Sequence, residues 1–509
     1  MGLAILKSRA AIGVEAPPVT IEVFLSGGLP RFNIVGLAET AVRESKDRVF
    51  GAIKSSGFEF PQRRITANLG PAEMRKTGGR FDLAIALGIL SASGQLPRER
   101  IDEFEFYGEL ALNGDLRPVS GVLPAAIKAA ADGKPIIVPR DNGSEAALAG
   151  GDVYISGSLR QVSSVLSKQS EATAVESVVA NDAANDSPDM RDVYGQRLAK
   201  RALEIAAAGG HNLLFVGPPG TGKSMLARRL PGLLPKMSDV EAMETAAVRS
   251  VLGLPLEISR WRCRPFRAPH HTASAIALVG GGRDPRPGEI SRAHNGVLFL
   301  DELAEYSRHV LETLREPMEA GRITISRAQG QADYPAQFQL IAAMNPCPCG
   351  YLGDGHGDCN CSRDAVQRYR GRLSGPLMDR IDIKVSVARP PVAMLRPGRA
   401  SEESSAVVAS RVHAARQRQI SRADALNARL DAAGLARAFS VSDDCYRLLE
   451  DAAMRLHLSA RALQRVQRVA RTIADLAGEE PVGRAHVAEA LGLWQVNRGK
   501  SQLPSSPIM

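Results

Sequence analysis

Two adjoining stretches decide the fold of the central part of this chain: Asn212-Leu213-Leu214-Phe215-Val216 and Gly217-Pro218-Pro219-Gly220-Thr221-Gly222-Lys223-Ser224. The first stretch is mostly apolar, which predicts a buried parallel strand. The second has the phosphate-loop pattern G-x-x-x-x-G-K-S, which leads into a helix. We therefore predict a strand, a phosphate-binding loop and a helix in direct succession.

The glycines of this loop allow its backbone N–H groups to turn inward around phosphate oxygens, and the following helix N-terminus adds positive potential. Lys223 is expected to neutralise the β- and γ-phosphates, and the Ser224 hydroxyl to bind Mg²⁺, so ATP and Mg²⁺ are the predicted cofactors. A plain Gly/Pro turn before a helix is a minor alternative, because the strand and the full spacing are both present. The predicted nucleotide-binding residues are Gly217, Pro218, Pro219, Gly220, Thr221, Gly222, Lys223 and Ser224.

A second predicted strand, residues 296–300, ends in two acids. Asp301 is expected to hold Mg²⁺ with its water shell, and Glu302 to polarise the water that attacks the γ-phosphate. An ordinary acidic loop after a strand is the alternative. The phosphate loop about eighty residues upstream favours the catalytic interpretation.

Length and composition indicate about three domains of a globular protein, because the chain has 509 residues, 44% hydrophobic and 23% charged. No run of about eighteen apolar residues occurs and the N-terminus lacks the apolar core of a signal peptide, so we expect a cytoplasmic protein without a membrane partner. The net charge is +9, and residues 363–437 alone contain 15 Arg and Lys against 7 Asp and Glu. Such a patch indicates either a polyanion such as nucleic acid or an arginine-rich surface against a neighbouring subunit.

The predicted fold class is α/β with a helical C-terminal part. In the first domain we expect strands at 19–25, 31–35 and 64–69, a buried helix at 81–90, and a hairpin at 109–117 with a two-residue type I′ turn at Asn113-Gly114. Residues 166–189 are polar, which predicts a flexible linker. The predicted parts are an N-terminal domain 1–165, the linker 166–189, an ATPase core 190–390, a helical lid 391–495 and a tail 496–509.

Several runs resemble the YifB/ComM family of Mg-chelatase-like AAA+ proteins, and the resemblance extends from near residue 3 to about 495. They lie at residues 27–37, 68–76, 266–274, 280–282, 287–291 and 345–350. The resemblance implies a homo-hexameric ring and an N-terminal domain similar to the Lon protease domain on a ribosomal-S5-like fold. The best-known member of the family is a branch-migration helicase of natural transformation, which implies a DNA motor with branched or single-stranded DNA and recombination proteins as partners.

The same resemblance implies roles for three more residues. Asn345 ends the predicted strand 338–344 at the sensor-1 position, where a polar side chain positions water. Arg380 corresponds to an arginine finger that acts in a neighbouring subunit, and Arg461 to the sensor-2 arginine at the γ-phosphate. A capping Asn is the alternative for Asn345, and a solvated helix charge for Arg461. The predicted catalytic residues are Lys223, Asp301, Glu302, Asn345, Arg380 and Arg461.

Four of the six cysteines lie in a short loop within residues 345–362. Cys347, Cys349, Cys359 and Cys361 form two C-x-C pairs with nine residues between them, which is enough loop to place four thiolates around Zn²⁺. Reduced loop cysteines or a thiol switch are the alternative. The paired histidines 270 and 271 lack a carboxylate at zincin spacing, so a ring-pore or intersubunit contact is the favoured interpretation there.

Three functions remain to be distinguished. The favoured function is an ATP-dependent DNA motor, and the alternative is a chelatase-like ATPase that remodels proteins and does not act on DNA. An ATP-dependent protease would need a nucleophile, but the run Lys76-Thr77-Gly78-Gly79-Arg80 places Arg80 where the Lon-like turn would carry its serine. We therefore expect a non-proteolytic N-terminal domain. The hairpin predicted after Gly321 presents Arg322 and Arg327, which could meet DNA phosphates or pack on a neighbouring subunit.

Overall fold

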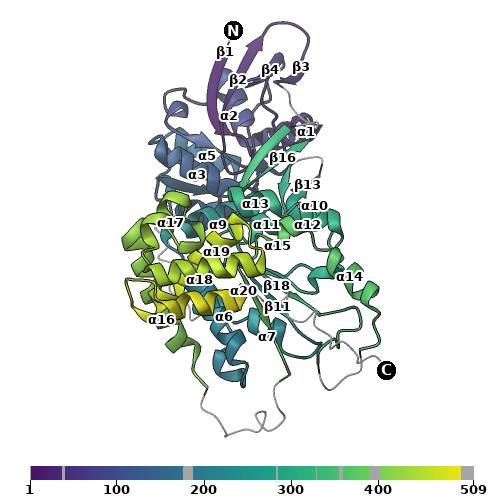
Figure 1. Ribbon diagram of the computed structural model, residues 1–509. Coiled ribbons are helices and arrows are strands. Elements are labelled where there is room, and N and C mark those ends of the chain that lie inside the picture. Colours follow the sequence, from purple (N-terminus) through teal and green to yellow (C-terminus); the bar gives the residue numbers. More distant parts are fainter. Residues whose placement is uncertain are drawn as a thin grey trace, which may run out of the picture.

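The chain folds into an N-terminal lobe, a central sheet and a C-terminal group of helices, as a computed structural model shows (Figure 1). In Figure 1 the N-terminal strands lie at the top, and the C-terminal helices α16 to α20 lie beside the central sheet. Among the helices of the described residues, none is both long and apolar enough to cross a membrane. The structure describes residues 2–36, 40–175, 187–282, 285–327, 330–354, 359–389 and 402–494.

The N-terminal lobe is built on an eight-stranded mixed sheet with the order β10-β9-β8-β5-β1-β2-β4-β3. β1 pairs antiparallel with β2, and β2 pairs antiparallel with β4. Alternate residues of these strands are buried, as expected for a sheet that covers a core with one face. The strands are β1 (Gly2–Arg9), β2 (Pro18–Ser26), β3 (Arg31–Val35), β4 (Arg64–Gly70), β5 (Glu105–Phe106), β8 (Ile136–Pro139), β9 (Val153–Ser156) and β10 (Thr173–Ala174).

Helix α2 is the core of this lobe, because all eleven of its residues are buried. Arg80, which stands just before α2, is buried as well, and its guanidinium donates to the carbonyl oxygens of Arg9, Ser120 and Gly121. Burial lowers the pKa of Arg80 to about 10. Arg80 therefore has a structural role in joining α2 to the start of α3. The helices of the lobe are α1 (Thr40–Ser55), α2 (Asp82–Ala92), α3 (Val122–Ala131), α4 (Gly143–Ala147) and α5 (Leu159–Leu166).

The hairpin at 109–117 exists, but its predicted type I′ turn is wrong. β6 (Glu109–Leu110) pairs with β7 (Leu116–Arg117), and the Gly114 N–H donates to the Ala111 carbonyl at 2.9 Å. Only Gly114 has a positive φ, +89°, whereas a type I′ turn needs positive values at both central residues. The connection is a three-residue loop with a left-handed glycine, which sequence alone does not separate from a two-residue Asn-Gly turn.

The structure differs from the predicted linker 166–189 at both of its ends. Leu166 is the last residue of α5, and β10 pairs antiparallel with β9. At the other end, the Asp189 carboxylate accepts from the N–H groups of Arg191 and Ser405. These residues are thus parts of the two folded lobes, while the middle of the predicted linker lies outside the described residues, as does the predicted tail.

The central sheet is fully parallel, with the strand order β12-β15-β18-β11-β19. Its three middle strands are buried on both faces, which explains why their sequences are continuous apolar runs. A two-stranded hairpin and a second, shorter pair of strands lie outside this sheet. The strands are β11 (Leu213–Val216), β12 (Phe266–Arg267), β13 (Gly280–Gly281), β14 (Arg286–Pro287), β15 (Val297–Leu300), β16 (Arg322–Arg327), β17 (Gly330–Pro335), β18 (Gln339–Met344) and β19 (Ile383–Ser386).

Short helices cover this sheet, and α9 connects it to the N-terminal lobe. The Ser250 carbonyl of α9 accepts from the Gly121 N–H at 2.8 Å, and the Ser250 hydroxyl accepts from the Leu123 N–H at 3.2 Å. The helices of the core are α6 (Arg197–Gly209), α7 (Lys223–Ala227), α8 (Leu230–Leu233), α9 (Asp239–Val251), α10 (Ala275–Val279), α11 (Glu289–Arg292), α12 (Arg308–Glu312), α13 (Arg315–Ala320), α14 (Arg363–Gly371) and α15 (Gly375–Met378).

The C-terminal helices pack on α6 and on the edge of the sheet at β19, through one continuous apolar cluster that they share with the core. Helix α19 is held by a buried ion pair in which Asp475 accepts from Arg422 and from Arg471. The C-terminal helices, the predicted lid, are therefore packed on the same domain that carries the phosphate loop. The helices are α16 (Ser405–Ala423), α17 (Ala432–Ala438), α18 (Asp443–Leu456), α19 (Ala460–Ala477) and α20 (Arg484–Trp494).

Candidate active site

The phosphate loop leaves β11 at the carboxyl edge of the sheet and ends in α7. Gly222, with φ +87°, precedes the helix in the left-handed region, which glycine adopts without a Cβ penalty. A Cβ on Gly217 would lie 2.2 Å from the Val387 carbonyl oxygen, so the loop can leave the strand only as glycine. Both glycines of the pattern are therefore required by the backbone path.

Lys223 is the centre of a polar cluster under this loop. Its ammonium donates to the carbonyl oxygens of Gly217 at 2.7 Å and Pro218 at 2.8 Å, and to Oδ1 of Asn345 at 3.1 Å. Burial lowers the pKa of Lys223, while the charges of Asp301 and Glu302 oppose that shift. The structure thus brings Asn345, at the end of β18, into direct contact with the phosphate-loop lysine.

Ser224 and Asp301 are also in contact, as the two predicted Mg²⁺ ligands should be. The Ser224 hydroxyl donates to Oδ2 of Asp301 at 2.6 Å, and Oδ1 of Asp301 accepts from the Glu302 N–H at 3.0 Å. A hydroxyl and a carboxylate are the oxygen ligands that Mg²⁺ takes beside substrate phosphates, so these residues fit the ion. A cavity of about 420 Å³ opens here, within the range of small-molecule sites, and is lined by residues 219–225, Asp301, Glu302, Met344 and Asn345.

Glu302 has a backbone conformation that is uncommon outside glycine, with φ +50°. Its side chain is 51% exposed, and Oε2 lies 2.9 Å from Nδ1 of His271. The segment before α10 that carries His271 is held against the site by Tyr306, whose hydroxyl donates to the Pro269 carbonyl at 2.7 Å. A strained backbone at a residue such as Glu302, the predicted base, is typical of active sites.

Sequence reasoning missed this role of His271. The structure places His271 against Glu302, the proposed base, within one chain, whereas the sequence favours a ring-pore or intersubunit contact. The His270 ring lies against the His271 ring, with centroids 4.2 Å apart and planes tilted by 33°. Nδ1 of His270 contacts the Thr272 hydroxyl and not Glu302. The contact depends on the pairing of β12 with β15, which places His271 beside the strand of the two acids and which the sequence does not show.

Arg380 and Arg461 are not brought into this cavity. Arg380 is buried, and its guanidinium contacts Glu319 at 2.5 Å and the Pro376 carbonyl at 2.7 Å. Arg461 is exposed in the first turn of α19, where the Ser459 hydroxyl caps the helix by accepting from the Ala462 N–H. The roles assigned to both arginines remain predictions.

The four loop cysteines come together beside the phosphate loop. Their sulfur atoms all lie within 4.8 Å of one another, and three Sγ–Sγ distances are 3.4, 3.6 and 3.7 Å. Tetrahedral zinc with Zn–S bonds of about 2.3 Å has sulfur atoms about 3.8 Å apart, so the quartet fits Zn²⁺. Gly350 of this loop packs on Pro219, because a Cβ there would lie 2.8 Å from the proline ring.

We predict that Glu302→Gln leaves ATP binding intact and lowers turnover by about 10²–10⁴-fold, because it removes a base and no phosphate contact. Lys223→Ala should instead weaken ATP binding by about 10–100-fold, the loss of a charge-assisted hydrogen bond. Equilibrium binding of ATP and steady-state phosphate release measure the two effects separately. Equal turnover in the wild type and in Glu302→Gln would refute the assignment of the base.

A second prediction concerns His271. His271→Ala should lower kcat by about tenfold with the KM for ATP nearly unchanged, because the Glu302 carboxylate loses the contact that orients it. His271→Asn, which retains an N–H donor, should recover part of kcat. His270→Ala is the matched control and should behave as the wild type. A rise in KM without a fall in kcat would show that His271 acts on nucleotide binding.

Family models match most of the chain in three pieces. The model described as "Subunit ChlI of Mg-chelatase" matches residues 21–142, "Magnesium chelatase, subunit ChlI" matches 189–395, and "Magnesium chelatase, subunit ChlI C-terminal" matches 402–493. The three matches fall in the N-terminal lobe, on the parallel sheet with its site, and on the C-terminal helices. This agrees with the predicted fold class.

Relatives that match along nearly their whole length identify the family more closely. The protein YifB of Salmonella typhimurium is 48% identical over 98% of both chains, and the competence protein ComM of Haemophilus influenzae is 49% identical over 97% of both. The magnesium-chelatase 38 kDa subunit of Cereibacter sphaeroides is 25% identical over 39% of this chain and 58% of its own length. The chain therefore belongs to the YifB/ComM family of Mg-chelatase-like ATPases of the AAA+ type.

Proposed function

We propose that this protein is an ATP-driven DNA motor, a homo-hexameric branch-migration helicase that acts in homologous recombination during natural transformation. The observation that carries the motor part is the contact of Lys223 and Ser224 with Asn345 and Asp301, because it joins ATP binding to a predicted hydrolytic centre. The DNA part is supported by the full-length likeness to a protein named for competence.

A basic hairpin offers a contact for DNA. β16 and β17 pair antiparallel over six residues, and Arg322 and Arg327 are exposed at opposite ends of β16. Phosphate contacts from such arginines hold a strand without reading its sequence, as a motor on branched DNA requires. In a ring, this hairpin would face the central pore.

The composition of the ATP cavity supports a ring. No arginine lines the described part of that cavity, yet hydrolysis in this class of enzyme uses an arginine on the γ-phosphate. Arg380 of a neighbouring subunit would supply it after leaving Glu319, whose side chain is 57% exposed. Arg461, exposed at the start of α19, would reach the same phosphate when the lid closes.

A chelatase-like ATPase that remodels proteins is the second candidate. It is favoured by the partial likeness to the magnesium-chelatase 38 kDa subunit. That likeness covers 39% of this chain, whereas the likeness to the competence protein covers 97% and includes the N-terminal lobe. Stimulation by a porphyrin-inserting partner together with indifference to DNA would support the second candidate.

We expect three-way or four-way junction DNA to raise ATP turnover at least about fivefold, a coupling of ordinary allosteric size. The wild type should also move strands of the junction in an ATP-dependent reaction. Glu302→Gln is the control, since it should bind junctions without moving them. Absence of junction binding at low salt, where phosphate contacts are strongest, would contradict the proposal.

Zinc at the cysteine quartet is the second part of the proposal. The purified protein should contain about one zinc per chain by elemental analysis, because four thiolates saturate a structural site. The double variant Cys349→Ser and Cys361→Ser should lose the metal. Cys263→Ser is the matched control, since Cys263 lies outside the quartet. Four freely titrating thiols in a metal-free wild type would contradict the zinc site.

A further inference from the structure

A second cavity, of about 600 Å³, lies at the edge strand β12 and shares no lining residue with the ATP cavity. Its walls include the residue that follows α7, one face of α9, most of residues 254–267 and the last residue of α11. Residues 187–188, Pro231 and Met237 also line it. Six arginines line it, against a single acidic lining residue, Glu257. The arginines are Arg228, Arg249, Arg260, Arg264, Arg267 and Arg292.

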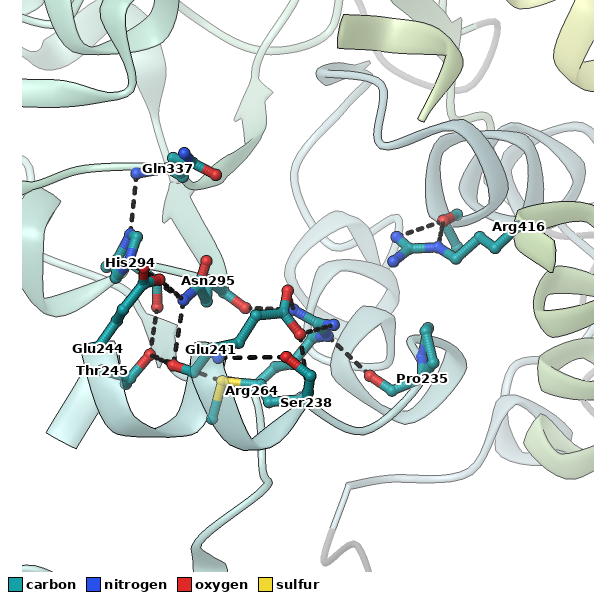
Figure 2. Close-up of polar contacts among 12 residues, drawn as sticks. Pro235, Ser238, Glu241, Glu244, Thr245, Arg264, His294, Asn295, Gln337 and Arg416 are labelled. Atoms are coloured by element: carbon teal, nitrogen blue, oxygen red, sulfur yellow. Dashed lines mark hydrogen bonds and ion pairs between the residues drawn. The ribbon is translucent and has the colours of Figure 1, made fainter. Parts of the chain in front are cut away.

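Arg264 is the one member of the six whose charge is fully compensated. Its guanidinium donates to both carboxylate oxygens of Glu241 at 3.1 and 3.0 Å, and to the carbonyl oxygens of Pro235 and Asn295, both at 2.7 Å (Figure 2). This bidentate pair lowers the pKa of Glu241 against the effect of its burial. Arg264 therefore forms a rigid wall and is not available to a ligand.

Arg267 and Arg292 share one carboxylate. Glu289 accepts from Arg267 at 2.7 and 3.0 Å and also pairs with Arg292. Burial and the positive charges of Arg267 and Arg249 lower the pKa of Arg292. About a third of each arginine side chain is exposed. This part of the wall thus keeps an uncompensated positive charge that faces the cavity.

The other three arginines have still less compensation. Arg249 and Arg260 each lie 3.7 Å from Glu257. Arg249 also donates to the Pro255 carbonyl at 2.8 Å, but its Nε is buried without a hydrogen-bond partner. Arg228 is exposed, and its guanidinium has no polar partner among the residues that the structure describes. For these three guanidinium groups the cavity lining offers one carboxylate, the half-exposed Glu257. An anion with several oxygens would satisfy this arrangement.

Two aromatic side chains also line the cavity. Trp261 and Phe266 line it, and the Trp261 side chain is partly exposed. Arginines interleaved with an accessible tryptophan are the combination that binds an unpaired nucleic-acid strand, with phosphates on the cations and a base stacked on the ring. The volume suffices for one or two nucleotides but not for a duplex, whose width exceeds such a cavity.

We propose that this arginine cavity binds an unpaired DNA strand, with its phosphates on Arg228, Arg249 and Arg260 and a base on Trp261. The proposal rests on the proposed function, in that DNA is the ligand, and it adds a strand-binding site separate from the β16–β17 hairpin. A motor that separates or exchanges strands has a use for such a site, because one strand must be held while the other moves. A free nucleotide presents the same chemistry, a base with phosphates, and the experiment separates the two sources.

The fluorescence of Trp261 reports binding directly. The chain has two tryptophans, so Trp494→Phe in the full-length protein leaves Trp261 as the only one. Combined with Lys223→Ala, which weakens the ATP site, this protein is titrated with oligothymidylate and, separately, with ADP. We expect oligothymidylate to quench the fluorescence and ADP to have little effect. Quenching by ADP alone would overturn the proposal in favour of a nucleotide site.

Charge variants supply the second measurement. Arg228→Gln with Arg260→Gln should weaken oligothymidylate binding at least about tenfold and reduce the salt slope by about 1.4, the loss of two single-strand phosphate contacts. Arg447→Gln with Arg455→Gln, exposed on α18, is the matched control and should leave both unchanged. If the double cavity variant fails to fold, Arg260→Gln alone is used, because 60% of that side chain is exposed.

The outcomes distinguish this inference from the proposed function. Wild-type binding that the cavity variants leave unchanged would overturn the strand-binding cavity and leave the DNA motor intact. No binding of oligothymidylate or of junction DNA at low salt would contradict the proposed function, and the cavity with it. Weakening confined to the cavity variants supports both.

Discussion

The hydrogen bond between Ser224 and Asp301 depends on a single constraint, the parallel pairing of β11, β18 and β15. Carboxyl ends of parallel strands meet at one edge, so the phosphate loop, Asn345 and the two acids emerge side by side. Nucleotide sites of open α/β sheets lie at such edges for this reason. The rest of the core serves to hold that edge rigid, through strands buried on both faces and helices that cover them.

Two loops contact the residues at this edge of the sheet. The segment that carries His271 follows β12 and contacts Glu302, while the cysteine loop follows β18 and packs on Pro219. Each loop therefore joins one side of the ATP site to another part of the surface. Movement of either loop would affect the predicted hydrolytic residues directly, because one loop contacts Glu302, the proposed base, and the other contacts the phosphate loop. In the proposed motor, DNA or a neighbouring subunit that moved either loop would act on the ATP site through these contacts.

Sequence alone predicted the parts that depend on local chemistry. The glycine and lysine pattern predicted the phosphate loop. Apolar runs that end in polar residues predicted β15, followed by the two acids, and β18, followed by Asn345. Contacts between distant segments could not be predicted in this way: His271 on Glu302, the arginine cavity beside β12, and β10 inside the expected linker all depend on tertiary pairing. The turn at Gly114 failed because Asn-Gly fits two loop lengths that differ only in backbone geometry.

The carboxyl edge of the sheet should bind Mg·ATP, and a structure of Glu302→Gln with ATP and Mg²⁺, determined by electron cryomicroscopy, tests this most directly. We expect the ion to contact the Ser224 hydroxyl, with Asp301 near its water shell. Lys223 should leave the carbonyl oxygens of Gly217 and Pro218 for the phosphates. Nucleotide bound elsewhere, or Lys223 still bonded to those carbonyls beside bound ATP, would contradict the account.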